Sequence, residues 1–391
     1  MSDRPKPEAD THSGLDPVRQ ATARRFAHKS RALHLADWLV RTATLAGLAL
    51  SGLGSYLRDA IPFARPLSGV LFLLIIVLAY TVLSLPVSYY RNFVMPRQLK
   101  LGTQSARSWL SATAKHGLLV VVLLSTISAL AYWAMDAFPA AWWWITGLFV
   151  VLFAVALNWL APVAILPLFF RLTPIDNTEL GGRLLNLARR AGAAVIGVYT
   201  GGQSGRRGMA NAVLIGMGRN RRIVLSGGVT HVYTPEEIEA MMAHEMGHAF
   251  HRDIPRLIAA QLLVGLAGFL VGYLILLLSA GSLGLNGVSD TAGLPLIILG
   301  ITIFSQLSGP LVSAYMRKLE HGADTYALQL TGNADAFISL MTKLADQNLN
   351  EANPSRLAEL IFYRHPSYQS RVERAIKFRE QSLCGALQCS G

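Results

Sequence analysis

The stretch His244-Glu245-Met246-Gly247-His248 contains the residues whose types and spacing most clearly predict chemistry. On a helix, residues four apart leave the same face, so His244 and His248 can hold one zinc ion together. Glu245 would lie beside the ion, where a carboxylate can take a proton from a zinc-bound water. The alternative is a pair of surface histidines on an amphipathic helix. The HExxH pattern favours zinc-dependent peptide hydrolysis.

The residues before this motif predict the helix that it requires. Thr234 is a suitable N-cap, and Pro235 fits the first helical position. Glu237 stands where it can complete a capping box with Thr234. We therefore expect a helix that starts at Pro235 and presents both imidazoles on one face.

A zinc peptidase needs a third protein ligand, and the sequence limits where it can be. The extended metzincin pattern requires glycine at position 251 and histidine at 254, but the chain has His251 and Ile254, which excludes that class. A glutamate from a second helix is the other common solution. Glu320 and Asp324 are four residues apart, so Glu320 could bind zinc while Asp324 accepts the free N–H of a ligating imidazole. The alternative is a solvated acidic face next to a membrane span.

The composition places these motifs in a membrane protein. Of 391 residues, 52% are hydrophobic and only 15% are charged, which is more apolar than an average soluble domain. Several runs, such as 119–132, contain no charge, which argues against the buried helices of a large soluble core. Arg41 interrupts the first apolar stretch, and Ser305 and Gln306 lie in the last. Six stretches approach spanning length: 36–57, 66–87, 116–137, 142–170, 256–280 and 293–316.

These features together predict the fold class. We expect a mainly α-helical, polytopic membrane protein with about six transmembrane helices. It would carry a zinc-peptidase catalytic domain of the gluzincin type, with a small β-sheet.

Positive charge predicts the orientation. Lys and Arg exceed Asp and Glu by 12, and the excess is concentrated in the first 35 residues and between residues 91 and 115. The link 281–292 contains no Lys or Arg, whereas Arg58 in the link 58–65 is an exception. With six spans, both termini and the segment 171–255 fall on the cytoplasmic side. The basic excess then faces anionic headgroups of the lipid bilayer, and no nucleic-acid partner is expected.

The spans divide the chain into five expected segments. The polar N-terminus is too long and too acidic for a cleaved signal peptide. The only cysteines, Cys384 and Cys389, exclude a disulfide framework and a cysteine zinc site. The segments are a cytoplasmic, disordered tail 1–35, a four-helix membrane region 36–170, a catalytic segment 171–255, a transmembrane hairpin 256–316 and a catalytic helical segment 317–391.

The catalytic segment 171–255 also carries strand signals. A helical pattern follows Pro174, and strand-like runs at 211–217 and 222–226 flank a turn. The glycine-rich stretch 201–208 lacks the order of a P-loop, so we expect a mobile loop there without phosphate binding.

With these motifs in view, the chain resembles the integral-membrane zinc metallopeptidases of the CAAX prenyl protease 1 group, within the M48 peptidases. In that family HExxH is followed, after a membrane hairpin, by the glutamate of an ExxAD motif, which matches residues 320–324 here. The matching anchors cover about 160–375. The further matches are Leu166-Pro167-Leu168-Phe169 with Thr173-Pro174, the pair Asn211-Ala212, and His365-Pro366 with Arg371.

The resemblance implies a role for each matched residue. One Zn²⁺ per chain would act on a peptide or membrane-protein substrate, and the oligomeric state stays open. The implied site consists of the zinc ligands His244, His248 and Glu320, the general base Glu245, the orienting Asp324, the substrate-binding Asn211 and Ala212 on an edge strand, and His365 and Arg371 as oxyanion-stabilising groups. His231, His251 and His321 are expected to be bystanders.

Departures from the family leave the substrate open. Eukaryotic members carry an additional N-terminal span and a longer loop before HExxH, and residues 226–228 stand where relatives often have an aspartate. The resemblance implies C-terminal cleavage of prenylated peptides in those relatives. The Ala/Arg/Gly-rich character here indicates a bacterial inner-membrane protein, for which misfolded or small membrane proteins are the expected substrates.

Two alternative functions remain at this point. An HtpX-like quality-control protease would share HExxH and the glutamate, but such proteases usually have fewer spans before the catalytic helix than the four expected here. A catalytically inactive membrane scaffold would need no zinc. Intramembrane charges would mark a transport path, and the expected spans hold almost none.

Overall fold

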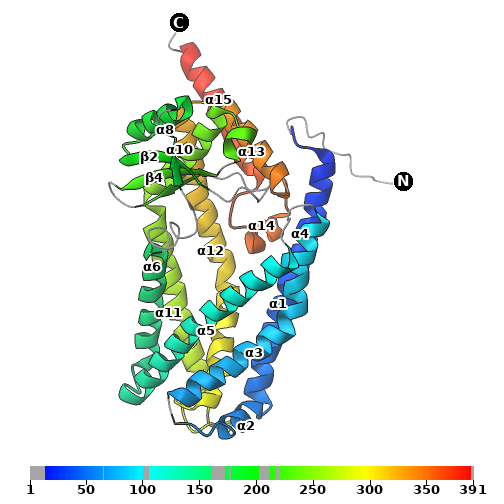
Figure 1. Ribbon diagram of the computed structural model, residues 1–391, viewed down its shortest axis with the longest axis vertical. Coiled ribbons are helices and arrows are strands. Elements are labelled where there is room, and N and C mark those ends of the chain that lie inside the picture. Colours follow the sequence, from blue (N-terminus) through cyan, green and yellow to red (C-terminus); the bar gives the residue numbers. More distant parts are fainter. Residues whose placement is uncertain are drawn as a thin grey trace, which may run out of the picture.

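The computed structural model of the chain describes residues 14–64, 66–99, 105–160, 172–175, 178–201, 212–216, 220–226 and 228–388. Long helices form one elongated body, and a small sheet with shorter helices covers one end of it (Figure 1). We call these parts the helical body and the catalytic cap. Helix α1 begins, and helix α15 ends, at the end of the molecule that carries the cap (Figure 1).

Six long helices make up the helical body. They are α1 (Pro17–Leu50), α3 (Leu67–Tyr89), α5 (Ala106–Ala137), α6 (Trp142–Leu160), α11 (Asp253–Ser279) and α12 (Leu294–Thr331). Among the described residues, four helical stretches are long and apolar enough to cross a membrane: Leu67–Gln98, Ala106–Ala137, Asp253–Ser279 and Thr291–Thr331. Large side chains such as Leu278 and Leu311 are 83% and 74% exposed, as expected where lipid replaces water. The prediction of a mainly helical membrane protein is confirmed.

The first expected span ends earlier than predicted. Helix α1 stops at Leu50, and the chain turns through Gly52, whose φ of 77° favours glycine. The short helix α2 (Leu53–Asp59) follows. The last part of the expected span 142–170 lies outside the described residues.

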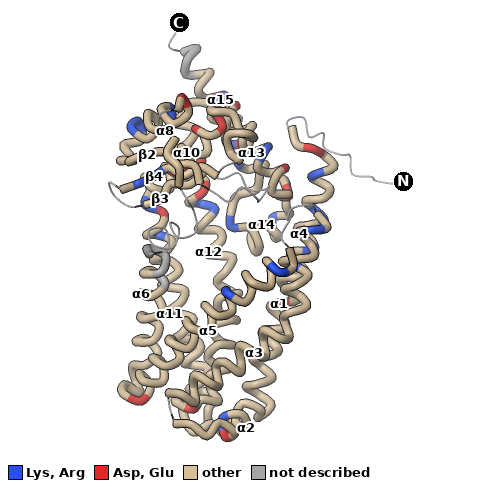
Figure 2. The backbone as a smooth tube through the Cα atoms, viewed as in Figure 1, with Lys and Arg blue, Asp and Glu red and all other residues tan. Residues whose placement is uncertain are grey.

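Short elements join the long helices at both ends of the body. Helix α3 continues through the π-helical turn η1 (Tyr90–Val94) into α4 (Met95–Gln98), and η3 (Thr291–Gly293) precedes α12. Near α2, Arg58 forms ion pairs with Asp59 and with the buried Asp290. Arg58, the exception to the charge bias, lies at the end of the body away from the cap (Figure 2). Its charge is neutralised there by these carboxylates.

The expectation of a disordered tail over residues 1–35 is wrong for residues 17–35, because α1 starts at Pro17. The Asp16 carboxylate caps the helix by accepting hydrogen bonds from the first turn. The extension of α1 then contacts the cap, since Gln20 bonds the Asn350 carbonyl and Arg31 lies 3.3 Å from Glu351. These contacts order a segment whose composition alone looks disordered.

The cap contains a four-stranded sheet in the order β1-β2-β4-β3. Strands β2 and β4 are parallel, and the other two pairs are antiparallel. The strands are β1 (Leu172–Pro174), β2 (Val195–Gly201), β3 (Ala212–Ile215) and β4 (Arg221–Ser226), with α8 (Glu179–Arg190) between β1 and β2. The two predicted strand runs correspond to β3 and β4, whereas β1 and β2 had not been predicted.

The hydrophobic core of the cap lies between the sheet and its helices. Leu184 from α8, Ile223 from β4, Met242 from α10 and Phe337 from α13 are fully buried in one cluster. The remaining cap helices are α9 (Val229–Val232), α10 (Pro235–His251), α13 (Ala334–Gln347), α14 (Arg356–Phe362) and α15 (Tyr368–Gln388). Helix α10, which carries HExxH, is therefore held on several sides.

The start of α10 is as predicted. The Thr234 hydroxyl accepts a hydrogen bond from the Glu237 amide, and the Glu237 carboxylate accepts one from the Thr234 amide. Glu237 is buried and also bonds Ser339 and Lys343 of α13. The capping box thus fixes both the start of the helix and its place against α13.

Candidate metal centre

Close packing of α10 on α12 brings the two halves of the candidate site together. A Cβ atom added to Gly247 would lie 2.9 Å from the Ala323 Cα, so only glycine permits this approach. Helix α12 runs without interruption from the helical body to Thr331. The expected segment boundary at 316 therefore falls inside one helix, which carries Glu320 rigidly from the membrane to the HExxH helix.

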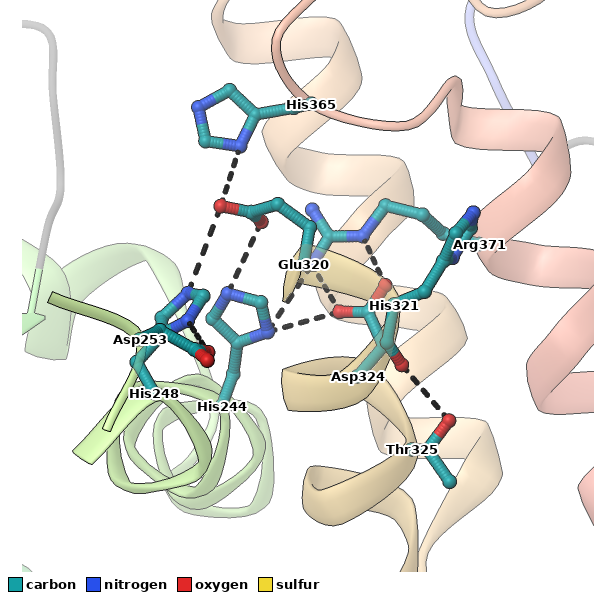
Figure 3. Close-up of polar contacts among 9 residues, drawn as sticks. All are labelled: His244, His248, Asp253, Glu320, His321, Asp324, Thr325, His365 and Arg371. Atoms are coloured by element: carbon teal, nitrogen blue, oxygen red, sulfur yellow. Dashed lines mark hydrogen bonds and ion pairs between the residues drawn. The ribbon is translucent and has the colours of Figure 1, made fainter. Parts of the chain in front are cut away.

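His244, His248 and Glu320 form the cluster in which a metal ion could bind. One ligand atom from each residue lies within 4.8 Å of the other two. The Nε2 atoms of His244 and His248 are 3.4 and 3.6 Å from the Glu320 carboxylate oxygens. Figure 3 shows both rings pointing at this carboxylate, which is only 9% exposed.

A carboxylate lies behind each of the two imidazoles. Asp324 Oδ1 is 2.9 Å from His244 Nδ1, and Asp253 Oδ2 is 2.9 Å from His248 Nδ1 (Figure 3). Both acids are buried. A proton held on Nδ1 leaves the Nε2 lone pair of each ring free for a metal ion.

Asp253 is a site residue that we had not predicted from the sequence. The chain bends after α10 at Arg252, whose φ of 57° is unusual for a residue other than glycine. This bend directs Asp253, the first residue of α11, back toward His248. A carboxylate five residues after HExxH was the only available signal, and sequence alone does not reveal the bend.

Arg371 lies on the buried side of His244, away from the place expected for an oxyanion donor. Its guanidinium bonds both oxygens of Asp324, with Nε 2.9 Å from Oδ2, and approaches His244 Nδ1 at 3.5 Å. The guanidinium of Arg371 is therefore engaged in a bidentate ion pair with Asp324. In this position Arg371 lies behind the His244 imidazole and can orient Asp324, rather than standing where an oxyanion donor was expected.

His365 lies on the open side of the cluster. Its Nδ1 is 3.1 Å from Glu320 Oε1, and its side chain is 67% exposed, on the link between α14 and α15. Arg317 of α12 holds this link by donating to the carbonyls of Glu359 and Tyr363. His365 therefore lies beside the Glu320 carboxylate, on the exposed side of the cluster.

The surroundings shift the acid–base properties of the HExxH helix. Burial lowers the pKa of His244, but hydrogen bonds to Asp324 and Glu320 outweigh it and raise the pKa to about 9. Burial raises the pKa of Glu245, which interacts electrostatically with His244, His248, Glu320 and His365. A metal ion at Nε2 would replace a proton of this cluster.

The remaining predicted residues lie apart from the cluster or outside the described residues. Ala212 is fully buried in β3 and pairs with Leu225, and Asn211 lies outside the described residues. His231 belongs to α9, and His321 points away from the face of α12 that carries Glu320. His251 contacts Tyr326 and is not part of the metal cluster.

Two protein-family models match the chain, and together they cover nearly all of it. The model described as peptidase family M48 matches residues 174–378, which is more than half of the chain. The model described as CAAX prenyl protease N-terminal, five membrane helices, matches residues 20–171. That description has one helix more than the four long helices α1, α3, α5 and α6 of the described part.

Individual relatives agree with these models. An uncharacterized metalloprotease, YhfN, from Bacillus subtilis is 28% identical over 378 residues, which is 95% of this chain and 88% of the relative. CAAX prenyl protease 1 from Saccharomyces cerevisiae is 26% identical over 317 residues, or 75% and 68% of the two chains. The crystal structure of S. mikatae Ste24p has the same fold, with a TM-score of 0.79 at 21% identity over 92% of this chain and 90% of that one. This chain belongs to peptidase family M48 and is an integral-membrane metalloprotease similar to CAAX prenyl protease 1.

Proposed function

We propose that this protein is a zinc endopeptidase that hydrolyses peptide bonds of membrane-associated peptides or proteins at the cytoplasmic face. The observation that carries the proposal is the cluster of His244, His248 and Glu320 ligand atoms within 4.8 Å of one another. This cluster lies where a membrane helix enters the catalytic cap (Figure 1). A peptide that reaches it can remain anchored in the bilayer.

The residues present fit zinc. Two imidazole nitrogens and one carboxylate oxygen form the ligand set of many catalytic zinc sites, which leave a fourth position for water. Asp324 and Asp253 hold the rings in the orientation that such a site needs. When bound there, the ion would lower the pKa of its water toward about 7 and polarise the scissile carbonyl.

The protein residues would divide the remaining work. Glu245 would accept the proton of the attacking water and pass it to the nitrogen of the leaving amine. His365, on the open side of the cluster, would donate a hydrogen bond to the carbonyl oxygen as it gains charge. Arg371 would act as a positioning residue, because it orients Asp324 and through it His244.

Strand β3 would bind the substrate backbone. It is the last strand in the sheet order, so its outer edge has no strand partner among the described residues. Strand β3 also packs against α10, next to the candidate zinc site. An extended peptide would add to this edge, and Asn211, which precedes Ala212 in the sequence, would hold the peptide in register.

The CAAX prenyl protease-like branch is the better supported of the two protease alternatives. The family model described as CAAX prenyl protease N-terminal matches residues 20–171, the membrane region that precedes the catalytic segment. An inactive scaffold is disfavoured, because such a protein would have no need to bury Asp253 and Asp324 behind two imidazoles.

Thiol labelling in intact cells tests the cytoplasmic placement. Cys384 is exposed near the end of α15, on the cap side, and Ser282 is exposed after α11, at the other end of the body. With Cys389→Ser, we expect Cys384 to be shielded from a membrane-impermeant maleimide until the cells are opened. A Ser282→Cys variant without the native cysteines should be labelled directly. The opposite pattern would place the catalytic cap outside the cytoplasm.

A further inference from the structure

A cavity lies on the side of α12 that faces away from the metal cluster. It has a volume of about 420 Å³, within the range of small-ligand sites. Its lining includes His321, Thr325 and Gln329, which follow one another along one face of α12. At 100° per residue, this face is turned more than a quarter of a turn from Glu320. The cavity is therefore separate from the candidate metal centre.

Three basic side chains line this cavity. They are His251 from the end of α10, His321 from α12 and Arg374 from α15. His251 Nδ1, His321 Nδ1 and Arg374 Nε are buried and have no hydrogen-bond partner in the described part of the chain. Buried polar atoms normally have partners, so three unpartnered nitrogen atoms in side chains that line one cavity point to a polar group bound there.

The charges around the cavity favour an anion. No carboxylate is found among its described lining residues. Asp324, the nearest acid on α12, already forms a bidentate pair with Arg371. Within the described part of the chain, Arg374, one helical turn after Arg371, forms no ion pair, and its Nε has no hydrogen-bond partner. A guanidinium and two imidazole N–H donors can bind the oxygen atoms of a phosphate group. Rotation of an imidazole ring about χ2 would turn its N–H toward that group.

From the expected end of the last span, we place the cavity at or just beyond the depth of the lipid headgroups. His251 is two residues before the start of the membrane helix α11. His321 is five residues beyond the expected end of the last span at 316, which is about 7.5 Å along a helix. The headgroup layer on one side of a bilayer is roughly 5–7 Å thick.

Exposed apolar side chains continue from the cavity toward the membrane. Phe250, which lines the cavity, is 64% exposed, and Ile254, at the start of α11, is 68% exposed. Such side chains suit the glycerol and acyl parts of a lipid, while the basic end of the cavity suits its phosphate. A free phosphate ion would make no use of this apolar rim.

We propose that this cavity binds the phosphodiester headgroup of an anionic phospholipid, with Arg374, His251 and His321 as the phosphate-binding residues. The lipid would lie against α10, α11 and α12, of which α10 and α12 carry the candidate zinc ligands. It would fix the position of the catalytic cap relative to the membrane surface. This binding is independent of catalysis.

Native mass spectrometry of the full-length protein tests the site. The protein would be released from nanodiscs that contain equal amounts of phosphatidylglycerol and phosphatidylcholine, and the retained lipids counted. We expect the wild type to retain phosphatidylglycerol, and Arg374→Gln to retain about tenfold less, because charge-assisted hydrogen bonds are lost. Arg379→Gln is the matched control, since it removes the same charge from α15 at an exposed pair with Asp335. It should retain lipid as the wild type does.

A variant that should gain lipid binding gives a result that misfolding cannot explain. Gln329→Lys adds a cation at the exposed rim of the cavity and should increase retention of phosphatidylglycerol. Equal retention by the wild type, Arg374→Gln and Gln329→Lys would overturn the proposal. A second outcome would also overturn it: inorganic phosphate stabilises the delipidated wild type, and phosphatidylglycerol is not preferred over phosphatidylcholine. The same measurements in a Glu245→Gln background separate failure of this site from failure of the proposed protease function.

Discussion

Replacing Glu245 by glutamine is expected to abolish peptide cleavage while the metal ion stays bound. The amide cannot accept the proton of the attacking water, and loss of a general base typically costs 10²–10⁴-fold in rate. Metal content should not change, because the cluster of ligand atoms is formed by His244, His248 and Glu320. Cleavage of a membrane-anchored reporter peptide, measured beside zinc content by mass spectrometry, gives both readouts.

Glu236→Gln is the matched control for this variant. Glu236 lies in the first turn of the same helix and pairs with Arg183 at the surface, so both cleavage and zinc content should persist. In cells, new protein termini in the membrane fraction should depend on Glu245. Loss of zinc together with activity in Glu245→Gln would assign Glu245 to the ligands and contradict its role as the base.

Glu320→Ala has the other large expected effect, the loss of metal and of all activity. The change removes one of three protein ligands, and it leaves His244 and His248 without the carboxylate that both Nε2 atoms face. Asp324→Asn should weaken metal affinity or activity by about 10–100-fold, because Asp324 only orients His244. Zinc analysis after identical dialysis distinguishes the two variants.

Asp335→Asn serves as the control for these carboxylates, since Asp335 is 75% exposed and pairs only with Arg379 among the described residues. It should keep full zinc content and activity. A zinc-replete, active Glu320→Ala protein would mean that the third ligand lies elsewhere. His365 would then be the next candidate, because its ring is 3.1 Å from the Glu320 carboxylate and His321 faces the other side of α12.

The central part of the site could be predicted because its spacing is local. HExxH and the Glu320–Asp324 pair each lie within one helix, where the 3.6-residue period decides which side chains share a face. The capping box at Thr234 and the apolar length of the spans are local signals of the same kind. The contact between α10 and α12 could not be predicted from these local signals. It was inferred from the resemblance to a family.

The parts that escaped prediction depend on contacts between distant segments. Asp253 reaches His248 only because the chain bends at Arg252, and Arg371 pairs with Asp324 from a different helix. The first residues of α1 look disordered by composition, but contacts with the cap near Glu351 order them. Strands β1 and β2 are short or interrupted by glycine, so their alternation is too weak to stand out.

X-ray absorption at the zinc edge of the purified protein tests the central claim most directly. With His244, His248 and Glu320 as ligands, the spectrum should show only nitrogen and oxygen neighbours at about 2.0–2.2 Å, with outer-shell scattering from two imidazole rings. Zinc should be present at one ion per chain. A sulfur neighbour at about 2.3 Å, or a spectrum without imidazole scattering, would contradict the proposed centre.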